Sequence, residues 1–99
     1  MITRFTWDPA KAASNKRDHE ISFEMAQEVF ADPNHIVTEN YHFEDDGEQR
    51  YLAIGMTLKL ALVVTVFVDR SDPFAEIIHI ISARRAVAYE QNLYEDQFH

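Results

Sequence analysis

The stretch Leu-Ala-Leu-Val-Val-Thr-Val-Phe-Val, residues 60–68, decides the fold. It is apolar at both odd and even positions, rich in valine and interrupted only by Thr65. This composition is typical of a central strand that is covered on both faces of its sheet. The run is also far shorter than the roughly 20 apolar residues that a membrane-spanning helix needs. We therefore expect helices on one face of a sheet and other parts of the chain on its second face.

Further strand patterns lie on both sides of this stretch. Residues 36–43 alternate imperfectly, residues 45–47 (Asp-Asp-Gly) supply a turn signal, and residues 50–56 alternate again, so a hairpin should precede the central strand. Residues 76–81 alternate after a second turn and predict another strand. Residues 2–7 are a candidate for an edge strand.

Helix signals occupy the N-terminal third of the chain. Asp8 followed by Pro9 is typical of an N-cap with proline in the first turn, and predicts a helix to about His19. Ser22 can cap a second short helix with an apolar stripe, which residues 32–33 (Asp-Pro) should end.

A last helix is predicted to begin after Ser82, as its N-cap, and to run to about Tyr94. The fold class is then α+β: two N-terminal helices, a mainly antiparallel meander sheet of three or four strands, and a C-terminal helix. The 99 residues suffice for one core, so we expect a single domain over residues 1–99.

The composition and the missing motifs exclude several kinds of functional site. The chain has no cysteine, which removes disulfides, thiolate metal sites and a cysteine nucleophile. It also has no glycine-rich phosphate loop, nucleophile elbow or paired-histidine metal motif, so we expect no cofactor and no metal. The N-terminus shows no signal-peptide core, and we expect a cytoplasmic protein without a membrane contact.

The charge balance argues against a uniformly cationic surface. Nine Lys and Arg stand against 17 Asp and Glu, a formal charge of -8. Phosphate-backbone binding draws its affinity from clustered cations. Most of the cations lie outside the acidic runs, however, which leaves room for a local basic patch.

Glu90 is the first candidate for chemistry, because it sits among apolar residues on the helix face that should meet the sheet. A buried carboxylate needs a partner, and Arg50 or Arg70 of the sheet is the expected one. The pair is either a structural lock between helix and sheet, or Glu90 serves as an acid or base or orients a catalytic arginine.

Arg84 and Arg85 fall at the start of the predicted last helix. Two arginines beside unpaired helix amides form an anion site, unless they are simply solvated. His79, on an isoleucine-rich strand, is a candidate base or acid, or else a partly buried core residue. His19 stands four residues from Asn15 on one face of the first helix, beside Lys16, and this polar group is either a functional contact or plain helix surface.

The ordered set of motifs resembles the BrnT toxin family over nearly the whole chain. The matching segments are Phe5-Thr6-Trp7-Asp8, Lys11-Ala12, Asn15, His19, Ile21-Ser22-Phe23, Ala26, Val29-Phe30, Asp32-Pro33, Glu48-x-Arg50, Ile54-Gly55, Ile80-Ile81-Ser82-Ala83-Arg84-Arg85-Ala86, Glu90 and Tyr94.

The resemblance implies a bacterial type II toxin: a RelE-like ribonuclease that inhibits translation and uses no metal. It also implies neutralisation by BrnA, an antitoxin with a ribbon-helix-helix domain, and operator DNA would be bound only through that antitoxin. The matched polar positions are Glu48, Arg50, Arg84 and Glu90, then His19 and Tyr94.

Metal-free RNA cleavage needs a base for the 2'-hydroxyl, cations for the phosphorane oxygens and an acid for the leaving oxygen. Arg50 and Arg84 are assigned to charge stabilisation, and His79 or Glu48 to proton transfer. RNA contacts are expected from four further residues: His19, Lys16, Arg85 and Tyr94.

Two positions depart from the family's pattern: Asp18 stands where members usually have lysine, and His79 where they usually have arginine. The alternative function is therefore a weakly active or inactive module that pairs with a ribbon-helix-helix antitoxin and tunes repression. A third interpretation is an acidic domain that binds a small anion at residues 82–85.

Overall fold

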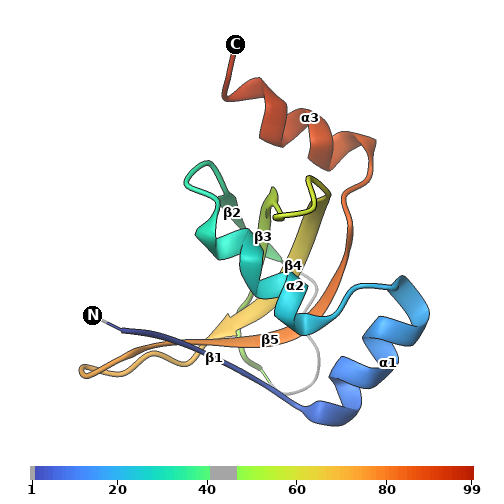
Figure 1. Ribbon diagram of the computed structural model, residues 1–99. Helices are drawn as coiled ribbons and strands as arrows, with labels where there is room; N and C mark the ends of the chain where they lie inside the picture. The colour runs from blue at the N-terminus through green and yellow to red at the C-terminus, as the bar shows by residue number, and fades with distance from the viewer. Residues whose placement is uncertain (1, 41–46) are drawn as a thin grey trace.

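The computed structural model describes residues 2–40 and 47–99 and has an α+β architecture (Figure 1). Its elements in chain order are β1 (Thr3–Trp7), α1 (Pro9–His19), α2 (Phe23–Gln27), the 3-10 turn η1 (Glu28–Ala31), β2 (Ile36–Asn40), β3 (Arg50–Met56), β4 (Leu62–Asp69), β5 (Glu76–Arg85) and α3 (Ala88–Asp96). The two N-terminal helices and the C-terminal helix are confirmed. Residues 41–46, which include the end of the first predicted hairpin strand and most of its turn, lie outside the described residues.

The strands form one mixed sheet in the order β1-β5-β4-β3-β2. The strands β2 to β5 pair antiparallel, whereas β1 lies parallel to β5. The prediction of three or four mainly antiparallel strands is therefore wrong in strand number, because residues 3–7 add a fifth, parallel strand. The strand pattern of residues 3–7 is weak because little of β1 is buried: Phe5 and Trp7 are half-buried, and the other residues of β1 are exposed.

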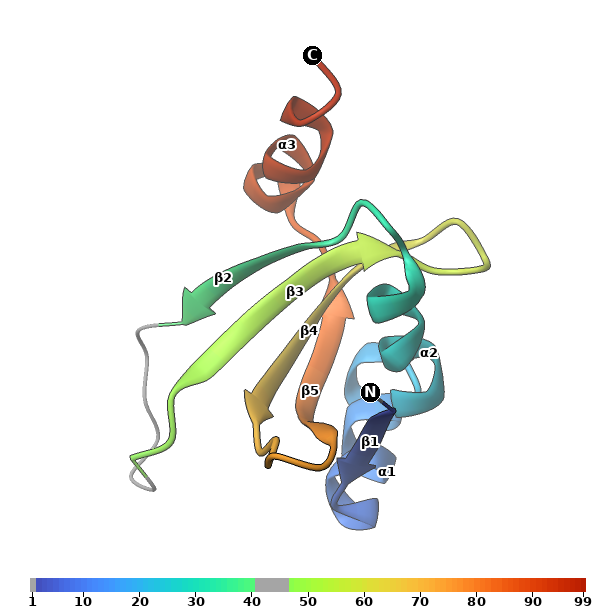
Figure 2. The same ribbon diagram turned by 90° about the vertical axis from the view of Figure 1, so that its left-hand side faces the viewer.

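The sheet has two faces, and different helices cover them (Figure 2). We call the side on which α2 and η1 pack the α2 face, and its core includes Phe23, Val29 and Val63. We call the opposite side the α3 face, where α3 lies over one end and buries Tyr94 against Ile54. The central strand β4 is thus covered on both faces, as residues 60–68 predict.

The contact between η1 and β3 is close enough to require a glycine. A Cβ added to Gly55 would lie 2.9 Å from Cγ1 of Val29 and 3.0 Å from Cβ of His35. Real Cβ atoms are rarely found this close to backbone-fixed neighbours, so a larger residue would force η1 away from the sheet.

The predicted helix starts are confirmed for α1 and α2. The Asp8 side chain accepts a hydrogen bond from the Ala10 amide at 2.9 Å, and Pro9 occupies the first turn. The Ser22 hydroxyl accepts from the Met25 amide at 3.0 Å. These caps satisfy amide groups that a helix N-terminus leaves without a backbone partner.

The last helix begins later than predicted. β5 continues to Arg85, and α3 starts at Ala88. Residues 82–85 pair with residues 63–66 of β4, so Ser82 lies within the strand and is not an N-cap. A full ladder with the central strand satisfies these backbone groups and outweighs the local capping signal.

This correction also removes the anion site predicted at a helix N-terminus, because Arg84 and Arg85 belong to a strand and point to opposite faces. In the described part of the chain, no helix is long and apolar enough to cross a membrane.

Candidate active site

His79 lies in a row of paired residues that crosses the α3 face. Arg50 of β3 pairs with Val68 of β4, Val68 pairs with His79 of β5, and His79 pairs with Thr6 of β1. Directly paired residues point to the same face, so this register brings side chains from four strands together. Arg50 and His79 are two strands apart, about 10 Å between backbones at the usual strand spacing.

The imidazole of His79 is held by Thr6, whose Oγ1 lies 2.8 Å from Nδ1. Burial lowers the pKa of His79 below its ordinary value of 6.5, and the cations Arg70 and Lys11 lower it further, against the opposing charges of Glu48 and Asp8. His79 is therefore mainly neutral at pH 7, the state in which an imidazole can accept a proton.

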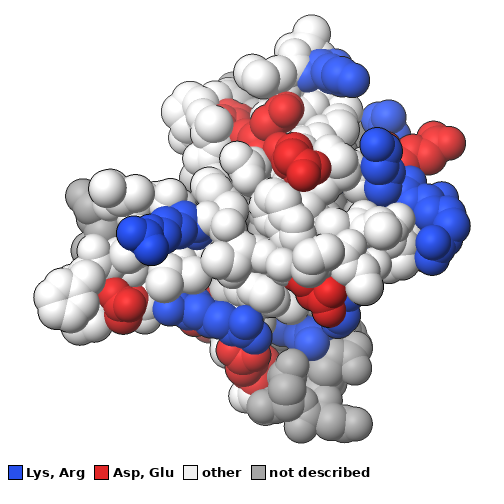
Figure 3. Space-filling view, turned by 60° about the horizontal axis from the view of Figure 1, so that its bottom comes forward, with Lys and Arg blue, Asp and Glu red and all other residues white. Residues whose placement is uncertain are grey.

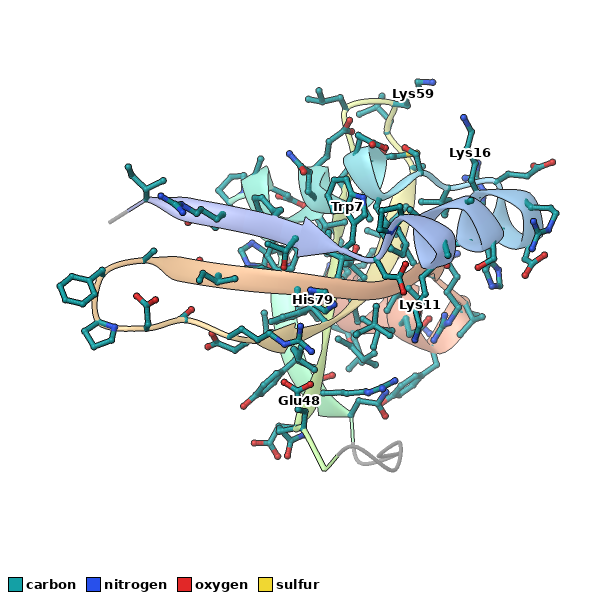
Figure 4. All side chains as sticks on the ribbon, turned by 90° about the horizontal axis from the view of Figure 1, so that it is seen from below. Trp7, Lys11, Lys16, Glu48, Lys59 and His79 are labelled. Carbon is teal, nitrogen blue, oxygen red and sulfur yellow. The ribbon has the colours of Figure 1, made fainter. Side chains whose placement is uncertain are left out.

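Beside His79, Arg70 and Glu48 form a bidentate ion pair. The guanidinium donates to Glu48 from Nη2 at 2.8 Å and from Nε at 3.1 Å. Both side chains keep more than a third of their surface exposed, 44% and 37%. In Figure 4, His79 and Lys11 lie near the middle of the view with Glu48 below them, and Lys16 and Lys59 lie at the top.

A shallow pocket of about 350 Å³ lies on the same side of the molecule. Three elements line it: α1, β3 and β5. The lining residues are Lys11, Ser14, Asn15, Asp18, His19, Arg50, Ile81 and Ser82. Arg50 is largely buried, with 8% of its surface exposed, so its side chain forms part of the floor. With the bottom of the molecule turned toward the viewer, Lys and Arg gather over the α1 side and along the lower middle, with acidic residues among them (Figure 3).

Asn15 fixes α1 at the edge of β5, beyond the point where β1 ends. Its Nδ2 donates to the carbonyl oxygens of Ala83 at 2.9 Å and Ile21 at 3.0 Å, and its Oδ1 accepts from the Ala83 amide at 3.1 Å. The carboxamide thus pairs with both backbone groups of Ala83, as a neighbouring strand would. This clamp places Lys11 and His19, which lie four residues to either side of Asn15, at the rim of the pocket.

Glu90 has a partner, but it is not the predicted one. Arg84 Nη1 and Nη2 donate to the two Glu90 carboxylate oxygens at 2.7 and 2.8 Å, so the prediction of Arg50 or Arg70 as partner is wrong. Glu90 also accepts from the Val87 amide at 2.9 Å and so caps α3. The hydrogen bonds from Arg84 lower the pKa of Glu90, and the same contact raises the pKa of Arg84. The pair joins α3 to β5, as a lock between helix and sheet would.

The structure separates the predicted site residues into groups. Four of them lie around the pocket and its neighbouring row: Arg50, His79, Glu48 and His19. Arg84 and Glu90 lie further along β5, tied to each other. The other three are elsewhere: Lys16 lies beside Glu20 and Glu24, Arg85 is exposed at the end of β5, and Tyr94 is buried with 6% exposure.

Three residues of this surface were not candidates from sequence: Thr6, Lys11 and Arg70 as a neighbour of His79. A signal for Lys11 exists, since it stands four residues before Asn15 on the same helix face. Thr6 lies in a segment that matches the family, but nothing in the sequence indicates its contact with His79, because that contact depends on the parallel register of β1. Within the described residues, no group of three or more His, Cys, Asp and Glu is placed to hold a metal ion.

These observations define a small α+β protein in which one sheet face carries a histidine among lysine and arginine side chains. The sequence model of the family described as "Ribonuclease toxin, BrnT, of type II toxin-antitoxin system" matches residues 7–90. The chain belongs to this BrnT family of ribonuclease toxins.

The fold is shared with solved structures. One of them is the crystal structure of the Brucella abortus ribonuclease toxin BrnT, with a TM-score of 0.61 and 21% sequence identity, covering 88% of this chain and 99% of that one. A search of curated proteins found no match.

Proposed function

We propose that this chain is a RelE-like endoribonuclease toxin that cleaves RNA on its α3 face without a metal ion. The observation that carries the proposal is the imidazole of His79, held by Thr6 at 2.8 Å and near the side chains of Lys11 and Arg70. A proton acceptor with a cation nearby is the combination that metal-free cleavage of a phosphodiester requires.

The proposed reaction is attack of the ribose 2'-oxygen on the adjacent phosphorus. His79 takes the proton of the 2'-hydroxyl through Nε2, while Nδ1 remains on the Thr6 hydroxyl. The new bond joins O2' to phosphorus, and the bond from phosphorus to O5' breaks. Lys11 and Arg50 stabilise the charge on the phosphorane oxygens, and Lys11 supplies the proton to the leaving O5'.

Substrate binding is proposed to extend along the pocket between α1 and β3. His19 and Arg50 line this pocket. Arg70, which Glu48 holds in a bidentate ion pair, acts on His79 only through its charge. Arg84 positions α3 and does not bind the phosphate in this mechanism, because both terminal nitrogens of Arg84 already donate hydrogen bonds to Glu90. Since the binding is electrostatic, cleavage should fall steeply as salt rises.

The biological consequence would be inhibition of translation through loss of RNA, relieved by a BrnA-like ribbon-helix-helix antitoxin. In this proposal the chain meets operator DNA only through that antitoxin.

The test is cleavage of a defined RNA in EDTA by the purified chain and by His79→Asn. Asparagine can still bond to Thr6 but cannot take a proton, so we expect a loss of about 10² to 10⁴ in rate. The products should carry 2',3'-cyclic phosphate and 5'-hydroxyl ends, and His99→Asn, in the exposed tail, should cleave as the wild type does. Intact RNA, or equal rates for wild type and His79→Asn, would reject the mechanism.

One acidic residue in the pocket favours a second candidate, a weakly active module that acts mainly by pairing with an antitoxin. Asp18 lines the same pocket as His19 and Arg50 and would repel a phosphate. Expression of the chain alone in a bacterium separates the two. Growth arrest with RNA fragmentation supports the nuclease, whereas normal growth with abundant folded protein supports the pairing module.

A further inference from the structure

A second surface of the molecule is apolar and lies between α3 and β2. We call it the α3 groove: it has a volume of about 390 Å³ and is lined by Thr38, Glu39, Leu52, Ile54, Tyr89, Glu90 and Leu93. Leu52 and Ile54 of β3 form its floor, and Leu93 and Tyr89 of α3 form one wall. The groove opens to solvent beside β2 and β3, which lie at one edge of the sheet.

Large hydrophobic side chains are exposed along its margins. Tyr89 keeps 70% of its surface in solvent, Val87 keeps 56%, and Val37 on β2 keeps 48%. Val37 points to the other face of β2 from Thr38, which lines the groove. An element lying along β2 would therefore meet apolar surface on both of its sides.

Acidic residues predominate on the two elements that flank the groove. The described residues of β2 and α3 include Glu39, Glu90, Glu95 and Asp96 but no lysine or arginine. Glu90 is neutralised by Arg84, so the charge that a partner would meet is that of the other three. Such a surface attracts a cationic partner and repels a second copy of a chain whose formal charge is -8.

The backbone of β2 offers a further means of binding. β2 is the last strand of the sheet, and within the described residues no strand pairs with its outer edge. Edge strands accept an added strand through main-chain hydrogen bonds, and neighbouring pockets then take every second side chain of the addition.

We propose that an extended, basic segment of the antitoxin adds to β2 as a sixth strand and places alternate apolar side chains in the α3 groove. The antitoxin as partner rests on the proposed function; the groove and its charge do not. Leu52 lies two residues from Arg50 on the same face of β3. A segment bound here lies directly beside the candidate active site and excludes RNA from it.

The experiment titrates the purified antitoxin encoded by the neighbouring gene into this chain and measures Kd by calorimetry. Every chain carries His79→Asn, so that production and readout do not depend on nuclease activity. The test variants are Tyr89→Ala and Glu39→Lys, both at exposed positions. Their controls are Phe74→Ala, at a side chain 91% exposed on the hairpin between β4 and β5, and Glu24→Lys on α2.

Each test variant should weaken binding about tenfold or more, because interface tyrosines often carry a large share of the binding energy and a lysine at position 39 would repel a basic partner. The two controls should stay within about twofold of the parent chain. Equal losses in controls and test variants, or no binding by the parent chain, would overturn the proposal. So would a dimer of this chain that Tyr89→Ala dissociates, because the groove would then hold a second copy.

The two proposals fail separately. A chain that binds the antitoxin through the groove but leaves RNA intact contradicts only the proposed nuclease, whereas a chain that cleaves RNA and binds the antitoxin independently of Tyr89 and Glu39 contradicts only the docking site.

Discussion

Replacing Asn15 with alanine removes the clamp that holds α1 against β5. The side chain makes three hydrogen bonds of 2.9 to 3.1 Å, all to backbone groups, and only 6% of the residue is exposed. Each such bond contributes about 1 kcal/mol net, so the clamp stabilises the fold by about 3 kcal/mol. Alanine returns about 0.6 kcal/mol through its better helix propensity.

We therefore expect Asn15→Ala to lower the free energy of unfolding by about 2 to 3 kcal/mol, from a total that is about 5 to 15 kcal/mol for a domain of ordinary stability. Urea unfolding followed by the fluorescence of Trp7 is a suitable assay. Trp7 is the single tryptophan and packs edge-on against Phe23 at 5.8 Å, so its emission reports the loss of the core.

Ser14→Ala is the matched control, one residue away on the same helix. The Ser14 hydroxyl donates to the Lys11 carbonyl at 3.1 Å within α1, and among the described residues it makes no bond to the sheet. Its loss should change the free energy of unfolding by less than about 0.5 kcal/mol. If Asn15→Ala came within about 1 kcal/mol of Ser14→Ala, the argument that the carboxamide replaces a strand at the edge of β5 would be wrong.

Three other predictions concern single side chains. Thr6→Val should slow RNA cleavage, because His79 loses the hydrogen bond that orients its ring. Thr6→Ser keeps a hydroxyl and should cleave at the wild-type rate. Thr3→Val is the control, because it removes another hydroxyl bond between β1 and β5 and should leave the rate unchanged. The pKa of Glu90 is lowered in the fold, so its contribution to stability is full above the unfolded value near 4.5 and is lost as pH falls through the lower folded value. Glu90→Gln should accordingly weaken the acid dependence of urea unfolding, and an unchanged pH profile would contradict this. Burial and the hydrogen bond to Asp32 raise the pKa of Tyr94 to about 12. In an alkaline titration followed by tyrosinate absorbance, the step near pH 12 should vanish in Tyr94→Phe, and its persistence would show that another tyrosine is responsible.

The sequence predicts elements well where a local signal and burial agree. The caps at Asp8 and Ser22 appear in the structure with the expected hydrogen bonds, and residues 60–68 lead directly to the central strand. In each of these cases neighbouring residues suffice to determine the element.

Prediction from the sequence fails where pairing with a residue far away in the chain determines the secondary structure. Ser82 resembles an N-cap in isolation, but its pairing with Val66 keeps it in a strand. β1 has only a weak pattern of its own, and it becomes a strand because β5, more than 70 residues later, offers a parallel edge.

The candidate site divides in the same way. His79 and Arg50 stand out in the sequence as polar residues on apolar strands, and the register brings them into one row. Glu90 is recognisable as a carboxylate that needs a partner, but the choice of Arg84 depends on where β5 ends and α3 begins. A local pattern identifies such groups, but only the pairing of the strands determines which of them come into contact.

The row that crosses the sheet also constrains when the site can form. Thr6 and His79 are 73 residues apart, and Asn15 meets Ala83 across 68 residues. A ribosome must therefore synthesise nearly the whole chain before either contact exists, and closing loops of this length makes folding slow compared with helix formation. A chain truncated before β5 has no row and no clamp, however well its first two helices form. Assembly of the candidate site is consequently among the last events in the making of this protein.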